Sequence, residues 1–174
     1  MSRSTFIRLC ALSAILAGAL RAIASFIPET SPNVYLLYFA IDLFLLFGTT
    51  ALFLVSVTGQ KVVGLAGFAL MFLALLVLIA RDIGVAPAGT YAGAAAVFSF
   101  GLDLLAIQIL RTRKIPSSIA LGWILSTILG PVGFFVPGLH LLFALSGILF
   151  GIAFACAGVA MWNLASNTDA NSRR

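Results

Sequence analysis

Six long runs of apolar residues, separated by short polar segments, organise this sequence. Each run is close to the roughly 20 residues that a helix needs to cross the hydrocarbon core of a bilayer. A chain in lipid must satisfy its own backbone hydrogen bonds, so such runs become helices. The pattern predicts transmembrane helices at 6–27, 34–57, 62–80, 91–110, 118–136 and 141–164.

The separators are short and rich in turn-forming residues, so consecutive helices should be antiparallel neighbours. We therefore expect an all-α integral membrane protein, a six-transmembrane-helix bundle of three helical hairpins. A single polytopic domain should span 1–164, and the polar tail at 165–174 should be disordered. The first run also resembles a signal peptide, but Arg21 precedes the small residues of the would-be cleavage site and the apolar run resumes after them, which favours a retained helix.

Composition agrees with the pattern. The chain is 62% hydrophobic and only 9% charged, with a mean hydropathy of +1.18, whereas soluble domains carry about 25% charged residues. A soluble protein with so few charges could not cover its surface. The lipid bilayer is thus the first predicted partner.

Basic residues predict the orientation. With six spans, most of them fall on one side of the membrane, and a Lys and Arg excess marks the cytoplasmic side. Both termini should be cytoplasmic, in the cell (cytoplasmic or inner) membrane. Tyrosines at the outer ends and Trp123 and Trp162 near the inner ends are expected as interfacial anchors. The net charge of +5 then reflects topology, and no nucleic-acid partner is expected; an anionic-lipid site at 111–114 is the alternative. The basic residues of this side are Arg3, Arg8, Lys61, Arg111, Arg113, Lys114, Arg173 and Arg174.

An internal repeat relates the first two hairpins. Arg21 precedes Asp42 by 21 residues, and Arg81 precedes Asp103 by 22. The acids lie in similar strings, FAIDL at 39–43 and FGLDL at 100–104. We interpret this as a hairpin duplication.

Acids inside spans are costly, so they normally have a partner within the protein or face water. A salt bridge between Arg21 and Asp42 is expected, because both lie roughly 9–12 Å along their helices from the outer end. Arg81 can extend to the interface. For Asp103 the candidates are Ser99 on its own helix, Ser126 or Thr127 on the next, or protonation.

These charges have two interpretations. The first is that they fix the register of the bundle, and the second is that Asp42 and Asp103 line a hydrated cavity for a proton, a cation or a small polar solute. In the last helix, Gly147, Gly151 and Gly158 form a ridge of small residues, which indicates close packing either within the chain or with a partner or second copy.

No catalytic motif is found, so we do not expect an enzyme. His140 stands alone on a predicted outer loop, and there is no Cys/His cluster, so neither a metal nor a cofactor is expected. The leading hypothesis is a small accessory or interaction subunit that packs against other membrane components, with the last helix the favoured face. The alternative is a small transporter or channel that uses Asp42 and Asp103.

Overall fold

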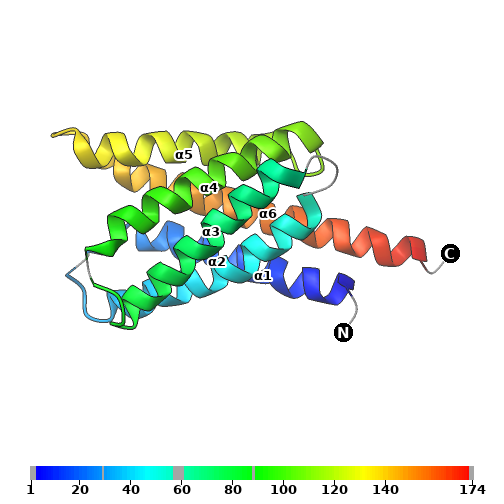
Figure 1. Ribbon diagram of the computed structural model, residues 1–174, viewed down its shortest axis with the longest axis horizontal. Coiled ribbons are helices and arrows are strands. Elements are labelled where there is room, and N and C mark those ends of the chain that lie inside the picture. The colour runs from blue at the N-terminus through cyan, green and yellow to red at the C-terminus, as the bar shows by residue number, and fades with distance from the viewer. Residues whose placement is uncertain (1–2, 29, 57–60, 88, 173–174) are drawn as a thin grey trace.

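The computed structural model describes residues 3–28, 30–56, 61–87 and 89–172, and these form six α-helices without a strand (Figure 1). All six are long and apolar enough to cross a membrane, which confirms the prediction of a multi-pass helical protein. The helices are α1 (Arg3–Ala24), α2 (Val34–Ser56), α3 (Lys61–Asp82), α4 (Thr90–Thr112), α5 (Ser117–Phe135) and α6 (His140–Ser172).

The last helix differs most from its predicted bounds. Instead of ending at 164 before a disordered tail, α6 continues to Ser172. No glycine or proline interrupts 165–172, and extending an existing helix requires no new nucleation. Glu29, the separator at 58–60, and Arg173 and Arg174 lie outside the described residues.

Helix ends coincide with a left-handed backbone or with a residue that blocks a helix. Arg113 caps α4 with φ 51°, and its N–H donates to the Ile109 carbonyl. Pro116 then precedes α5, and Gly138, with φ 86°, turns the chain from α5 into α6. These short turns reverse the chain, so that α1 begins and α6 ends at the same end of the bundle (Figure 1).

Each helix packs against its neighbours in the chain, and α6 packs against α1, so the helices close into a ring. The contact between α1 and α6 is the most extensive, followed by that between α3 and α4. The seam between α4 and α5 is the least extensive of those between consecutive helices.

Glycines make the close contacts possible. Gly18 of α1 lies against Gly151 of α6, so that a Cβ on either would collide with the other's carbonyl oxygen. A Cβ on Gly67 of α3 would lie 2.7 Å from the Gly101 carbonyl oxygen of α4, and the reverse distance is also 2.7 Å. Small residues let helix backbones approach closely, which is how helices in lipid gain packing energy.

A buried aromatic row fills the space between α4, α5 and α6. Trp123 is fully buried, with its ring 4.8 Å from that of Phe154, and Phe150 and Phe98 continue the row. The expectation that Trp123 anchors the chain at the membrane interface is therefore wrong. Its side chain faces α6, where its large apolar area contributes to the core.

We predict that Gly101→Ala destabilises the bundle by about 1–3 kcal/mol, because the new Cβ would press on the backbone of α3. Thermal unfolding in detergent measures the effect. Gly93→Ala is the matched control on the same helix, since a Cβ there meets nothing within 4 Å and alanine favours a helix by about 1 kcal/mol. Equal melting temperatures for the two variants would contradict the close α3–α4 contact.

Candidate functional site

Two arginines and two aspartates converge at the end of the bundle where α1 and α3 end. Arg21 lies in the last turn of α1, Arg81 and Asp82 end α3, and Asp42 lies early in α2. Antiparallel packing brings the ends of α1 and α3 beside the starts of α2 and α4. We call Arg21, Asp42, Arg81 and Asp82 the charge cluster.

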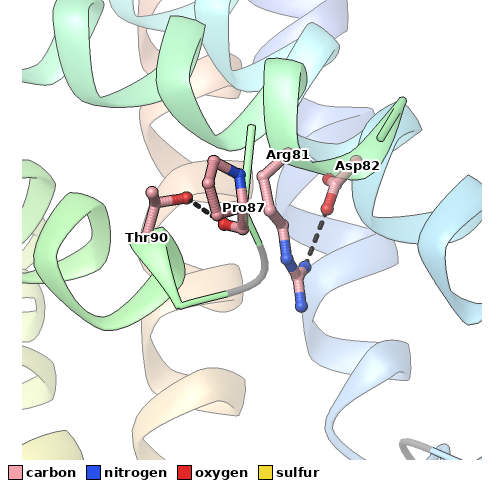
Figure 2. A network of polar contacts seen from close by, with 4 residues as sticks. All are labelled: Arg81, Asp82, Pro87 and Thr90. Atoms are coloured by element: carbon pink, nitrogen blue, oxygen red, sulfur yellow. Dashed lines mark hydrogen bonds and ion pairs between the residues drawn. The ribbon is translucent and has the colours of Figure 1, made fainter. Parts of the chain in front are cut away.

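An ion pair between Arg81 and Asp82 is the most direct contact in the charge cluster, with Nη1 2.8 Å from Oδ1 (Figure 2). Only 15% of the Arg81 side chain and 1% of the Asp82 side chain are exposed. The Arg81 guanidinium also lies 4.9 Å from the ring centres of both Tyr35 and Tyr91. These rings attract a cation through their π faces. Arg81 thus joins α2, α3 and α4.

Asp42 lies near Asp82, whose charge acts on it. Arg21 and Arg81 act on Asp42 electrostatically, but among the described residues no nitrogen of Arg21 lies within 4.0 Å of an Asp42 oxygen. The predicted Arg21–Asp42 salt bridge is therefore not formed.

Arg21 turns toward α6 instead. Its Nη2 lies 3.6 Å from the position that a Cβ on Gly147 would occupy. The side chain also lines a cavity of about 240 Å³ between α1, α2 and α6. The other lining residues are Ala24, Ser25, Ile27, Pro28, Tyr38, His140, Phe143 and Ala144.

Asp103 forms a separate polar contact across the seam between α4 and α5. The Thr127 hydroxyl lies 2.8 Å from Oδ1 and 3.1 Å from Oδ2, so Thr127 is the partner among those predicted. The other candidates bond elsewhere or not at all. Ser126 and Ser146 exchange hydroxyl-to-carbonyl hydrogen bonds of 3.0 and 2.9 Å, and among the described residues Ser99 forms no hydrogen bond to Asp103.

The glycine ridge of α6 faces α1. A Cβ on Gly158 would lie 2.6 Å from the Ala11 carbonyl oxygen, and one on Gly151 would meet Gly18 and Ala22. A Cβ on Gly147 would collide with the Ser25 hydroxyl. This ridge is therefore covered by α1.

Comparison with known proteins gives no further guide to the site. No protein-family model, curated protein or solved structure matches the chain.

Sequence reasoning misses the role of Asp82 and the two tyrosines. The hydropathy pattern places Asp82 in a loop, although it belongs to the last turn of α3 directly after Arg81. The available signal is the adjacency of an acid and a base at a predicted helix end opposite Asp42. The described residues contain no group of three His, Cys, Asp or Glu side chains arranged for a metal ion.

We predict that Arg81→Gln destabilises the protein by about 3–5 kcal/mol, because it removes the cation from a buried pair and leaves Asp82 uncompensated. The stability of Arg81→Lys should lie between that of Arg81→Gln and that of the wild type, since lysine keeps the charge but loses the planar group that stacks on two rings. Thermal unfolding in lipid nanodiscs measures both effects.

Arg111→Gln is the control for loss of one positive charge, because Arg111 is exposed at the last turn of α4. If Arg81→Gln and Arg111→Gln have the same melting temperature, the charge cluster contributes nothing to stability.

Proposed function

We propose that this chain is an accessory subunit of the cell membrane that binds another transmembrane protein through the seam between α4 and α5. The bundle would have both termini in the cytoplasm and derive from a duplicated hairpin. The observation that carries the proposal is Asp103, an acid near the middle of a spanning helix with no cation beside it among the described residues.

Asp103 has fewer partners than a carboxylate in lipid requires. Among the described residues its hydrogen-bond donor is Thr127, and no basic group lies within 4.0 Å. The Thr127 hydroxyl has one proton, and the Ile124 carbonyl oxygen at 2.9 Å competes for it. An acid at this depth normally pairs with another group. A cation from a second protein would complete the site.

The surroundings of Asp103 offer further acceptors. Pro131 lies inside α5 and has no N–H, so the Thr127 carbonyl lacks its usual helical donor. A carboxylate and a freed carbonyl thus lie on neighbouring helices. Such an arrangement of acceptors favours a lysine or arginine on the partner, because both side chains carry charge and several donors.

The seam is also open to a helix. Phe100 shares a helix face with Asp103 and is 60% exposed, while Ile128 of α5 is 56% exposed. The α4–α5 seam has the least internal packing between consecutive helices, whereas the α6 ridge is occupied by α1. This moves the favoured docking face from α6 to α4 and α5.

A pair of synthetic peptides tests the proposal. We predict that a polyleucine transmembrane peptide with one central lysine associates with the reconstituted protein more strongly than an all-leucine peptide. Polar contacts between helices in lipid contribute about 1–2 kcal/mol, which is roughly 5- to 30-fold in association. Energy transfer between labelled protein and labelled peptide measures it.

Asp103→Asn should abolish this preference, while Arg111→Gln should preserve it because Arg111 is at the helix end. Equal association of the two peptides with the wild type would overturn the proposal.

A second function, transport of a proton or small polar solute, is favoured by the cavity beside the charge cluster. This cavity is lined by polar groups of Arg21, Ser25, Tyr38 and His140. Tyr38 lies one helical turn before Asp42 on α2. We predict that, if transport occurs, vesicles containing the protein show a solute or proton flux that Arg21→Gln reduces and Asp103→Asn leaves unchanged. Vesicles that match protein-free controls would exclude it.

A further inference from the structure

The Arg21 guanidinium has no direct partner among the described residues. No carboxylate oxygen of theirs lies within 4.0 Å of it, and none of their acceptors receives a hydrogen bond from it. Asp42 interacts with it only at longer range. A guanidinium carries five N–H donors, and donors withdrawn from water without an acceptor are costly. Arg21 therefore has donors available for a ligand.

The cavity that Arg21 lines, between α1, α2 and α6, is suited to an anion. Tyr38 and His140 also line it, and each side chain can donate a hydrogen bond. None of the described residues in the lining is acidic. The volume of about 240 Å³ is below the roughly 300–1,000 Å³ of pockets for drug-sized molecules. A small anionic group therefore fits the cavity better than a large ligand.

The cavity lies close to a membrane surface. Arg21 is three residues before the end of α1, which is roughly 4–5 Å along the helix axis, and His140 begins α6. Spanning helices leave the hydrocarbon core near their ends and there reach the headgroup region. The lining also includes the apolar side chains of Ile27 and Phe143. Charged donors beside apolar surface at this depth match the boundary between a lipid phosphate and its chains.

We propose that this cavity binds a phosphate group, with Arg21 as its main ligand and Tyr38 and His140 as further donors. A guanidinium holds phosphate through two parallel hydrogen bonds, which gives both strength and orientation. The position of the cavity favours a phospholipid as the source over a soluble phosphate. The proposal rests on neither function proposed above, because binding requires no partner at the α4–α5 seam and no flux.

Native mass spectrometry of the full-length chain in mild detergent measures the binding. The probes are phosphatidic acid and a diacylglycerol with the same acyl chains but no phosphate. We predict that Arg21→Gln binds phosphatidic acid about tenfold more weakly than the wild type, because it loses a charged hydrogen-bond donor. Diacylglycerol should bind equally to both proteins. Unchanged binding of phosphatidic acid by Arg21→Gln would overturn the proposal.

Excess inorganic phosphate separates the two sources of the phosphate group. If the cavity takes a phospholipid, phosphatidic acid stays bound when inorganic phosphate is added. If the cavity takes soluble phosphate, the inorganic ion displaces the lipid from the wild type. Either result supports a phosphate site, provided that the binding depends on Arg21.

Arg111→Gln is the control for loss of one positive charge. Arg111 is exposed in the last turn of α4, at the opposite end of the bundle from the cavity. This variant should bind phosphatidic acid as the wild type does. An equal loss of binding in Arg111→Gln and Arg21→Gln would mean that only the overall charge matters, and the proposal would fail.

Ala144→Leu tests the cavity while keeping the arginine. Ala144 belongs to the lining, so a leucine there would fill part of the space that the phosphate group needs. Phosphatidic acid should therefore bind more weakly to this variant, and a cooperative thermal transition shows that it is folded. This variant decides the question even if Arg21→Gln fails to fold, because unchanged binding by folded Ala144→Leu would place the lipid elsewhere.

Discussion

A charged side chain surrounded by hydrocarbon has to find its compensation within the protein, and this requirement links α2, α3 and α4. Arg81 shows how it is met. One guanidinium bonds Asp82 on its own helix and lies against aromatic rings from α2 and α4. The starts of α2 and α4 and the end of α3 are thereby held at one place, near Asp42.

Close packing and polar contacts occur between different pairs of helices. Where the helices lie closest, between α1 and α6 and between α3 and α4, glycines allow backbone to touch backbone. Where the packing is least extensive, between α4 and α5, the contact includes a carboxylate and a hydroxyl. In lipid, close packing of small residues stabilises helix pairs without any polar group. The acid at the looser seam is therefore the feature that packing alone does not explain.

The number and apolar character of the helices could be predicted from the sequence, because hydropathy alone determines which segments satisfy themselves in lipid. Side-chain pairing could not. The predicted repeat equates Asp42 with Asp103, yet Asp42 lies beside the Arg81–Asp82 ion pair and Asp103 contacts Thr127. Equal spacing in the chain fixes neither which helix lies opposite nor how each helix is rotated. The prediction for Trp123 fails for the same reason, since its distance from a helix end says nothing about the face on which it lies.

The position of Arg81 has a consequence for biogenesis. If helices enter the membrane in chain order, α1 and α2 arrive before the segment that carries Arg81 and Asp82. The first hairpin alone lacks Arg81, whose charge acts on Asp42 in the finished bundle, and Arg21 is turned toward α6, which is made last. Early intermediates would thus hold an acid whose final environment is not yet synthesised. The bundle is complete only when α6, the last helix, packs against α1. Assembly therefore depends on the whole chain rather than on each hairpin in turn.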